Sequence, residues 1–395
     1  MLSSDYSYEL IELRPEELED FFGRRDFDGV NVTIPYKEAV IPLLDRIDDA
    51  AGQIGAVNTV VCENGRLVGY NTDQHGMRMA ILRAGIEPAG KKALICGTGG
   101  TSKTAEYVLR SLGARDVVRL TRRDGAGVTY NDAYERHADA SVIVNTTPCG
   151  MYPDNYSSPI DLEKFPALEG VFDAVYNPLR TPLVMKARKL GIKAAGGLYM
   201  LVAQAERASE LFRGTVCGKG CVDAVYESLL RECENVVLTG MPSSGKTTVG
   251  RLVADSLGKD FIDTDDVIVE KEGRTIPEIF SSEGEKYFRD AESEVIKEVS
   301  MLRGKVIATG GGSVLREENV CALKQNGRIF FLDRPLSSLT PTDDRPLSGD
   351  AQSLEKRYRE RIDIYNAACD VRIENAGTAQ EASDVIVRSF TEDTE

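Results

Sequence analysis

The sequence predicts an α/β protein with parallel sheets, and its 395 residues suffice for more than one domain. Extended, β-rich runs alternate with amphipathic helical patterns along most of the chain, which is typical of parallel sheets joined by crossover helices. Two units of strand, glycine-rich loop and helix stand out, at Ala93–Ala105 and at Asn235–Val253. Each unit can open its own doubly wound domain, so we expect two such domains in tandem.

Composition and charge exclude several classes of protein. The formal net charge is −15, whereas a non-specific nucleic-acid binder needs a basic face to release counterions, so we expect no nucleic-acid partner. No apolar run reaches the ~18 residues that span a bilayer. The segment Met1–Leu13 lacks the basic and apolar pattern of a signal peptide. We therefore expect a cytoplasmic protein that has no membrane partner.

The eight cysteines are scattered along the chain, as is typical of reduced thiols in a reducing compartment. Cys217 and Cys221 form one close pair, but no second pair follows at the spacing of a zinc site. The two histidines, His75 and His137, are distant from this pair in the sequence. Because a structural zinc site normally has four ligands, the sequence favours free thiols over a metal site there.

In the N-terminal half, amide and hydroxyl side chains recur where predicted strands end. They lie in Asn31–Lys37, in Gly55–Thr59 and in Gly69–Asp73. A predicted hairpin, Val60–Val68, separates the last two segments and turns at Glu63-Asn64-Gly65. Such clusters can bind a polyhydroxylated ligand, although helix capping and turn formation also explain the same residue types.

The first glycine-rich unit has the features of a dinucleotide site. A short buried strand, Ala93–Cys96, runs into Gly97-Thr-Gly99-Gly100 and a helix that continues through Leu112. The next strand, Val117–Leu120, ends in Thr121-Arg122-Arg123, where an NAD site usually has an acidic residue for the ribose. Two guanidinium groups suit a 2′-phosphate, so NADP is favoured over NAD, and a solvated basic turn is the alternative.

Eight stretches of this half, taken in order, form a family pattern: NVTIPYK, GAVNT, GYNTD, GTGGTSKTA, LTRR, NTTPCGMYP, DAVYNPLRTPL and GGLYMLVAQA. Together they resemble shikimate dehydrogenase over about Tyr6–Phe212. The resemblance implies that NADPH reduces 3-dehydroshikimate and that Lys37 and Asp73 are the catalytic pair, with the identity of the proton donor left open. It implies substrate contacts from Thr33, Asn58, Tyr176 and Gln204. It implies cofactor contacts from Gly97, Gly99, Gly100, Thr121, Arg122, Gly150 and Met151.

The resemblance also implies a domain layout and reveals one departure from the family. Residues 1–84, completed by residues 177–214, would form a substrate domain, and residues 85–176 an NADP-binding Rossmann domain. The family opens with a strand and a Ser-x-Ser segment that binds the substrate carboxylate. Here Ser3 and Ser4 are adjacent and directly precede Tyr8–Leu13, which matches the family's second strand. We therefore expect either a truncated chain or an impaired dehydrogenase half, because each hydrogen bond to a charged group contributes ~1.5–3 kcal/mol.

The second glycine-rich unit is a phosphate-binding loop in its required context. A buried strand, Asn235–Thr239, leads into Gly240-Met-Pro-Ser-Ser-Gly245-Lys246-Thr247 and a helix over Thr248–Leu257. Backbone N–H groups of the loop and the helix N-terminus favour a phosphate. Lys246 would hold the β- and γ-phosphates of ATP, and the Thr247 hydroxyl would bind Mg²⁺. The ATP-contacting residues predicted by this pattern are Gly240, Gly245, Lys246, Thr247 and Thr248.

Carboxylates and glycines follow the next two strands. Strand Phe261–Ile262 ends in Asp263-Thr264-Asp265-Asp266, and strand alternation would place Asp263 and Asp265 on one face, near the metal and a second substrate. A long helix is expected next, with a capping box at Thr275–Glu278. Further along it, Arg289 and Glu292 share a face, for which a solvated ion pair is the alternative explanation. Strand Val306–Ala308 then runs into three glycines, which imply close approach to a ligand.

These segments also fit a family pattern: GMPSSGKTTVGRLVA, FIDTDDVIVEKEGRTIPEIFSSEGEKYFRDAE, VIATGGGSV, DDRPL and RYRERIDIYNAACD. They resemble shikimate kinase over about Glu234–Phe390. The resemblance implies a kinase domain with a parallel five-stranded sheet at residues 235–395, after a linker at residues 215–234. It places Asp263 beside Mg²⁺ and makes Arg345 a lid arginine that, with Lys246, stabilises phosphoryl transfer. The implied shikimate-binding residues are Asp265, Arg289, Gly311, Gly312 and Arg361.

Three hypotheses follow from these observations. The first is a bifunctional enzyme that reduces 3-dehydroshikimate to shikimate with NADPH and then phosphorylates shikimate with ATP and Mg²⁺. The second is a shikimate kinase whose N-terminal module is dehydrogenase-like but impaired. The third is a nucleotide-sensing regulator without catalysis, against which the complete set of predicted kinase residues argues. The oligomeric state is not encoded in these patterns, and a homodimer is one expectation.

Overall fold

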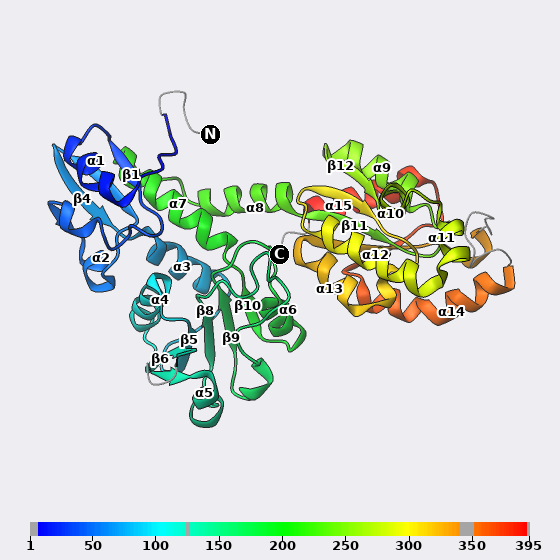
Figure 1. The fold of residues 1–395 in the computed structure, drawn as a ribbon, viewed down its shortest axis with the longest axis horizontal. Coiled ribbons are helices and arrows are strands. Elements are labelled where there is room, and N and C mark those ends of the chain that lie inside the picture. The colour runs from blue at the N-terminus through cyan, green and yellow to red at the C-terminus, as the bar shows by residue number, and fades with distance from the viewer. Residues whose placement is uncertain (1–6, 124–126, 340–350, 393–395) are drawn as a thin grey trace. The chain divides into compact units, whose positions relative to one another are not determined.

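The computed structural model describes residues 7–123, 127–339 and 351–392 (Figure 1). The chain forms two units. The first holds the described residues up to Pro148, together with Pro159–Ala174 and Ala187–Val222. The second holds Cys149–Ser158, Val175–Lys186 and the described residues from Asp223 onwards. Within the described ranges, no helix has the length and apolar character needed to cross a membrane.

A small mixed sheet, in the order β1-β3-β4-β2, begins the first unit. Its strands are β1 (Gly29–Asn31), β2 (Arg46–Ile47), β3 (Thr59–Glu63) and β4 (Arg66–Tyr70). The predicted hairpin is confirmed, because β3 and β4 are antiparallel and Asn64 and Gly65 turn between them with φ of 53° and 76°. Leu18 and Phe22 pack with Val60 and Leu67 in the core beside this sheet. The helices here are α1 (Leu18–Arg24), α2 (Asp49–Ile54) and α3 (Thr72–Arg83).

The strand expected at Tyr8–Leu13 is not formed. These residues have no regular secondary structure, and Leu10 is 94% exposed. The segment is attached by side chains instead, since Tyr36 Oη donates to the Leu13 carbonyl oxygen at 2.6 Å and Asn31 Nδ2 donates to Tyr8 Oη at 3.1 Å. A strand needs a neighbour to pair its backbone groups, and no strand pairs with this segment among the described residues.

A second sheet of the first unit has six parallel strands in the order β10-β9-β8-β5-β6-β7. From the other edge, this is the 3-2-1-4-5-6 order of the dinucleotide-binding fold. The strands are β5 (Lys92–Cys96), β6 (Asp116–Thr121), β7 (Val128–Thr129), β8 (Val142–Asn145), β9 (Gly170–Asp173) and β10 (Lys193–Ala195). The helices that accompany or follow them are α4 (Gly100–Ser111), α5 (Tyr130–Arg136), α6 (Pro182–Lys189) and α7 (Leu198–Arg213). The order reverses between β5 and β8, where such folds bind ligands.

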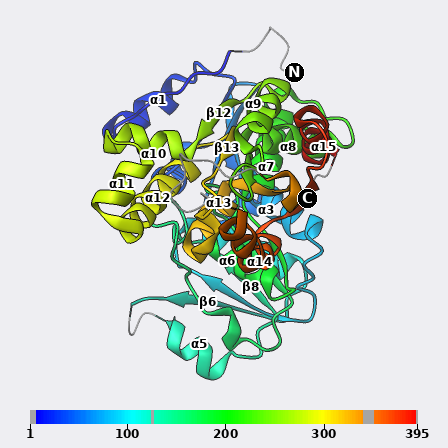
Figure 2. The ribbon, with the colours of Figure 1, turned by 90° about the vertical axis from the view of Figure 1, so that its right-hand side faces the viewer.

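The second unit contains the expected five-stranded parallel sheet, in the order β12-β13-β11-β14-β15. The strands are β11 (Asn235–Thr239), β12 (Asp260–Asp263), β13 (Lys305–Ala308), β14 (Gly327–Asp333) and β15 (Val371–Glu374). Val236 and Leu238 of β11 face a core shared with α9 and α15, whereas Val237 faces one shared with α10, α11, α12 and α13 (Figure 2). These helices are α9 (Lys246–Leu257), α10 (Thr264–Glu272), α11 (Ile276–Ser282), α12 (Gly284–Ser300), α13 (Glu317–Asn326) and α15 (Ala379–Glu392).

Two predictions about helices need comment. The single long helix expected from Thr275 is wrong, because α11 and α12 are separate and Gly284 has a φ of 84° at their junction. The predicted capping box is present, since Thr275 and Glu278 exchange hydrogen bonds at the start of α11. The segment predicted as a linker contains α8 (Cys221–Cys233). The remaining helix, α14 (Ala351–Ala368), precedes β15.

The second unit also includes residues 149–158 and 175–186, which come long before its sheet in the sequence. The last two residues of α13 contact both segments: Gln325 Nε2 donates to the Asn155 carbonyl oxygen at 2.6 Å, and Asn326 Oδ1 accepts the backbone N–H of Leu179 at 3.0 Å. The buried Glu234 accepts hydrogen bonds from Arg180 and, at 3.0 Å, from Arg328. These segments are thus part of the folded body around the sheet, and the domain boundaries expected from the sequence stay a prediction.

Candidate active sites

Lys37 and Asp73 are paired in the first unit. Lys37 lies in a turn after β1 and Asp73 in the first turn of α3. Lys37 Nζ donates to Asp73 Oδ2 at 2.7 Å, and the two side chains are 27% and 17% exposed. A partly desolvated lysine held by a carboxylate can transfer a proton to or from a bound ligand, and solvent can replace that proton.

Two of the predicted substrate residues belong to a hydrogen-bond network beside this pair. The backbone N–H of Thr72 donates to Asn58 Oδ1 at 2.7 Å, and Asn58 Nδ2 donates to Thr72 Oγ1 at 3.1 Å. Thr72 Oγ1 donates to Gln204 Oε1 of α7 at 3.3 Å. Gly76 permits the close approach of α3 to α7, because an added Cβ would collide with the backbone of Met200. Thr72, for which the sequence left ligand binding and helix capping as alternatives, therefore links Asn58 to Gln204.

The other predicted residues for this substrate and its cofactor lie elsewhere. Thr33 is exposed in the turn that leads to Lys37. Tyr176 and Met151 are 44% and 41% exposed and, like the buried Gly150, belong to the second unit. Gly150, Met151 and Tyr176 therefore belong to a different unit from Lys37, and their roles stay predictions.

The predicted dinucleotide loop joins β5 to α4. Gly97 has a φ of 111°, and an added Cβ there would lie 2.9 Å from Thr146 Oγ1, so the turn requires glycine. Gly99 and Gly100 have open space where a Cβ would be, and no side chain caps the N-terminus of α4. Its backbone N–H groups are therefore available to a phosphate at the point where the strand order reverses. The structure thus fits the cofactor that the sequence predicts.

The residues expected to select NADP follow β6 directly. Thr121 is buried at the end of the strand, and its Oγ1 accepts the backbone N–H of Arg123 at 3.1 Å. This bond fixes the start of the turn, from which the exposed Arg122 and Arg123 extend. Two solvent-accessible guanidinium groups at this strand end suit a 2′-phosphate.

The phosphate-binding loop of the second unit lies between β11 and α9, as the sequence predicts. Gly240 and Gly245 have φ of 151° and 90°, which favour glycine. Lys246 is buried, and its Nζ donates to the carbonyl oxygens of Gly240 at 3.0 Å and of Met241 at 2.9 Å. A bound phosphate would replace these acceptors, so the lysine is already positioned within the loop. Thr248 is exposed in the first turn of α9.

Thr247 and Asp263, the predicted metal ligands, are adjacent. Thr247 Oγ1 donates to Asp263 Oδ2 at 2.8 Å, and Asp263 Oδ1 accepts the backbone N–H of Asp265 at 3.1 Å. The strand alternation proposed for Asp263 and Asp265 is wrong, because β12 ends at Asp263 and Asp265 is already in α10. A helix cap therefore joins the Asp263 carboxylate to the backbone of Asp265. A hydroxyl and a carboxylate are the hard oxygen donors that fit Mg²⁺.

Arg289 is held by a buried carboxylate. Its Nη1 donates to Glu292 Oε2 at 2.7 Å, and Glu292 Oε1 accepts a hydrogen bond from Ser313 Oγ at 2.7 Å. Glu292 is fully buried and the Arg289 side chain is only 12% exposed, so the solvated ion pair is excluded. An added Cβ on Gly312 would collide with the Arg289 guanidinium, and one on Gly310 would lie 2.8 Å from Asp265 Oδ1. The triple glycine thus lies against both Arg289 and Asp265.

The third predicted contact group meets the same glycines from α14. Arg361 Nη1 donates to the Gly311 carbonyl oxygen at 3.1 Å, and Tyr365 Oη donates to the same atom. Burial raises the pKa of Tyr365 to about 12, so the phenol stays protonated and remains a donor. A Cβ on Gly311 would lie 3.0 Å from Pro242 in the phosphate-binding loop. Tyr365 had no distinguishing signal in the sequence, because a buried helical tyrosine is more often a core residue.

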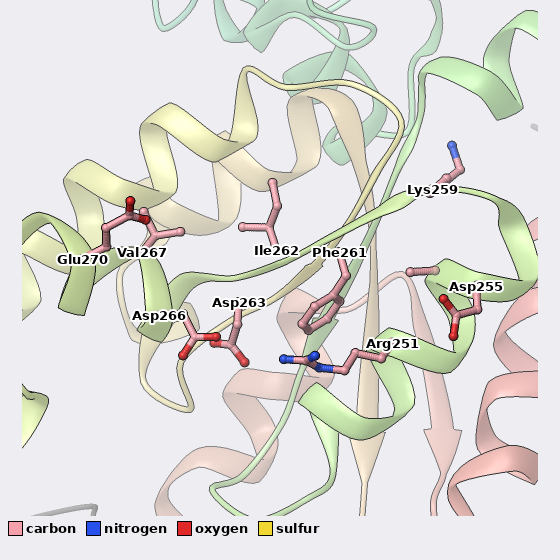
Figure 3. Close-up of a pocket in the computed structure, with 10 residues that line it drawn as sticks. Arg251, Asp255, Lys259, Phe261, Ile262, Asp263, Asp266, Val267 and Glu270 are labelled. Carbon is pink, nitrogen blue, oxygen red and sulfur yellow. The ribbon is translucent and has the colours of Figure 1, made fainter.

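Two further features complete the description of this region. Arg345, the predicted lid arginine, lies outside the described residues. An open hollow of about 550 Å³ lies along the edge strand β12 (Figure 3). It is lined by Asp263, Asp266 and Arg251, among others, and the Arg251 guanidinium lies 5.3 Å from the centre of the Phe261 ring. No residue of the phosphate-binding loop lines the hollow, so we place the predicted chemistry at the loop.

Comparisons with known proteins find relatives of both halves of the chain. The family model described as shikimate kinase matches residues 242–391, and the one described as shikimate dehydrogenase substrate binding domain matches residues 1–60. An NADP(+)-dependent shikimate dehydrogenase from Moorella thermoacetica is 36% identical over 240 residues, which cover 56% of this chain and 79% of that protein. A chorismate mutase/shikimate 5-dehydrogenase fusion protein from Clostridium acetobutylicum has a TM-score of 0.52 at 32% identity, over 55% of this chain and 84% of that one.

A solved shikimate kinase from Acinetobacter baumannii, in complex with shikimate, is 34% identical, with a TM-score of 0.40, over 42% of this chain and 97% of that one. A dinucleotide-binding fold with a lysine–aspartate pair, followed by a phosphate-binding-loop fold with a threonine–aspartate pair, defines a protein that joins the oxidoreductase and kinase classes. The chain belongs to the shikimate dehydrogenase family and carries a shikimate kinase domain at residues 242–391.

Proposed function

We propose that the chain catalyses two consecutive reactions: NADPH-dependent reduction of 3-dehydroshikimate to shikimate, and ATP-dependent phosphorylation of shikimate at its 3-hydroxyl. One observation carries the proposal. The same chain matches the dehydrogenase and kinase families, and the product of the first reaction is the substrate of the second. The two families are recognised through different residues, so the agreement between their substrates is independent support.

In the first reaction, bound NADPH supplies a hydride to the substrate ketone. Asn58 and Gln204 bind the substrate hydroxyls, and Thr72 keeps the amides of both residues in place. Lys37 provides the proton that the new alkoxide needs, and Asp73, 2.7 Å from Lys37 Nζ, orients the lysine. The Thr121-Arg122-Arg123 turn binds the 2′-phosphate of the cofactor.

In the second reaction, bound Mg²⁺ neutralises charge on the ATP phosphates, and Thr247 and Asp263 hold the ion. Lys246 binds the β- and γ-phosphates. Arg289 and Arg361 bind the shikimate carboxylate, since a guanidinium presents two parallel N–H groups to it. Asp265 accepts a substrate hydroxyl from beside the triple glycine. Arg345 is proposed as the lid residue by family resemblance alone.

A coupled assay on the full chain tests the proposal. Supplied with 3-dehydroshikimate, NADPH, ATP and Mg²⁺, the protein should form shikimate 3-phosphate, and NADPH loss should match phosphorylated product mole for mole. Omitting ATP should leave shikimate as the product. If ATP-dependent phosphorylation occurs with added shikimate, but shikimate is not oxidised by NADP⁺ and 3-dehydroshikimate is not reduced, the kinase-only alternative is correct.

The second candidate function, a kinase with an impaired dehydrogenase-like module, has less support. That candidate is based on the family's first strand and Ser-x-Ser segment, which this sequence does not match. Against it, the described residues contain a hydrogen-bonded Lys37–Asp73 pair and a glycine-rich loop before a helix that no side chain caps, and both features support the first candidate. We expect both reactions in the cytoplasm, where the free cysteines would remain reduced.

A further inference from the structure

Three side chains with metal-ligating atoms meet where α7 ends and α8 begins. They are Glu206 of α7, Cys217 of the connection and Cys221 at the start of α8. One carboxylate oxygen and the two Sγ atoms all lie within 4.8 Å of one another. In the described part of the chain, no other three histidine, cysteine or acidic side chains come together in this way. The sequence does not reveal this group, because its third member is far from the cysteine pair along the chain.

The backbone holds both cysteines in place. Helix α7 ends at Gly214, which has a φ of 61°. Glu210 Oε1 then accepts the backbone N–H of Cys217 at 2.8 Å, and its Oε2 accepts from Arg207 at 2.8 Å. The backbone N–H of Cys221 donates to the Gly218 carbonyl oxygen at 3.1 Å. The backbone at both cysteines is therefore held by hydrogen bonds of the main-chain N–H groups, which do not use the sulfur atoms.

Arg213 provides the outer contact that a bound thiolate needs. Its Nη2 donates to Cys217 Sγ at 3.0 Å, and its Nε donates to the Ser209 carbonyl oxygen at 3.2 Å. An N–H group that donates to a ligating atom orients that atom and tunes its basicity, as second-shell partners do at known metal sites. The arginine can keep this bond when the sulfur binds a metal, because the sulfur has more than one lone pair.

We propose that Cys217, Cys221 and Glu206 bind one Zn²⁺ ion, with a water molecule as the fourth ligand. Two thiolates and a carboxylate suit zinc better than Mg²⁺ or Ca²⁺, which prefer oxygen donors. Zn–S bonds of ~2.3 Å in a tetrahedron require sulfur atoms ~3.8 Å apart, which fits the observed group. On binding, the hydrated ion keeps one water ligand and releases the others, two Zn–S bonds and one Zn–O bond to Glu206 form, and the thiol protons pass to solvent. The ion would cross-link α7, through Glu206, to the connection and to the start of α8.

Cobalt substitution of the full chain tests this proposal. Metal-free protein, kept reduced with a phosphine, should bind one equivalent of Co²⁺ at the cluster and develop a sulfur-to-cobalt charge-transfer band, which one equivalent of Zn²⁺ should abolish. C217S and C221S should each remove most of the band, and E206Q should weaken Co²⁺ binding at least ~10-fold. C233S alters another partly buried cysteine and should leave the band unchanged. The oxygen ligands at Thr247 and Asp263 cannot produce this band, so the kinase metal site does not confuse the result.

Circular dichroism of each metal-free variant provides the folding check, because the cluster lies in the first unit, whereas kinase activity reports on the second. In the wild type, Zn²⁺ should also raise the melting temperature, and the C217S/C221S double variant should show no such rise. The proposal is overturned if folded, reduced protein develops no charge-transfer band with Co²⁺. It is equally overturned if the band persists in the double variant. Neither outcome depends on the dehydrogenase or the kinase reaction.

Discussion

Lys37 Nζ lies 2.7 Å from Asp73 Oδ2, although the two residues are separated by a hairpin and a helix in the sequence. If Lys37 supplies the proton to the alkoxide, the Lys37→Ala variant should lower kcat for 3-dehydroshikimate reduction by ~10²–10⁴-fold. The kinase rate should not change. Both rates can be measured on one preparation, by NADPH absorbance and by a coupled ADP assay.

Lys91→Ala is the matched control for this prediction. Lys91 also pairs with a carboxylate, that of Glu169 at 2.8 Å, but it directly precedes β5, whereas the cofactor loop follows the other end of that strand. The control should retain full activity. A Lys37→Ala variant that reduced substrate at the wild-type rate would refute the role that we assign to the lysine.

The cofactor preference should depend on Arg122. Removal of its guanidinium in Arg122→Ala should raise KM for NADPH ~10-fold or more, because a charge-assisted hydrogen bond to the 2′-phosphate contributes ~1.5–3 kcal/mol. KM for NADH should barely change, since NADH lacks that phosphate. Arg119→Ala is the control, as Arg119 lies on the same strand but pairs with Glu106 at 3.2 Å. Equal losses with both cofactors would contradict the assignment.

Gly312 is expected to set the position of Arg289. In Gly312→Ala the new methyl group would collide with the guanidinium, which must then move away from the substrate carboxylate. KM for shikimate should rise ~10–100-fold while KM for ATP stays close to that of the wild type. Gly23→Ala, where an added Cβ meets nothing within 4 Å, should have no effect. A parallel loss of ATP affinity would indicate general damage to the loop instead.

Asp263 and Asp266 are close in sequence but should differ in function. In Asp263→Asn, the loss of the charge that faces Thr247 should raise the Mg²⁺ concentration for half-maximal kinase activity ~10-fold, since each charged ligand strengthens the site. Asp266→Asn changes an exposed carboxylate that lines the hollow in Figure 3, and the Mg²⁺ titration should match that of the wild type. Identical shifts in the two variants would mean that general surface charge, rather than ligation, was being measured.

Glu234 should be important for the stability of the second unit. The side chain is buried and accepts hydrogen bonds from Arg180 and Arg328, so Glu234→Ala would leave two buried cations without their partner. We expect the free energy of unfolding to fall by ~3–5 kcal/mol in urea titrations that follow kinase activity and circular dichroism together. Glu227→Ala removes an exposed pair with Arg231 and should lower it by less than ~0.5 kcal/mol. A similar small loss at both positions would contradict the prediction.

Much of the fold could be predicted because local patterns determine it. The phosphate-binding loop, the hairpin at Asn64-Gly65 and the turn at Gly97 each need backbone conformations that few residues adopt, so their glycines are informative. The strands before these loops are short, apolar and buried, and they agree with the structure at Asn235–Thr239 and within one residue at Ala93–Cys96. The family motifs then supplied the site residues.

The remainder depends on contacts between distant segments, which periodicity does not report. From the sequence, a solvated ion pair was one explanation for Arg289 and Glu292. In the structure Glu292 is completely buried and accepts a hydrogen bond from Ser313. Asp263 and Asp265 were assigned to a strand, whereas the chain changes to a helix between them. Tyr8–Leu13 has the composition of a strand, but whether it forms one depends on a neighbour that its own residues cannot specify.

Gln325 and Asn326 form hydrogen bonds with residues 149–158 and 175–186. These bonds affect whether the kinase part can be produced as a separate fragment. A gene fragment that begins at Glu234 would encode every kinase motif, yet it would lack both segments. The side-chain amides of Gln325 and Asn326 would then be exposed, and Glu234 would lose its hydrogen bond from Arg180. Such an excised piece should be poorly soluble and readily digested by protease. The start of the kinase match in the sequence is therefore not the boundary of the second folded unit.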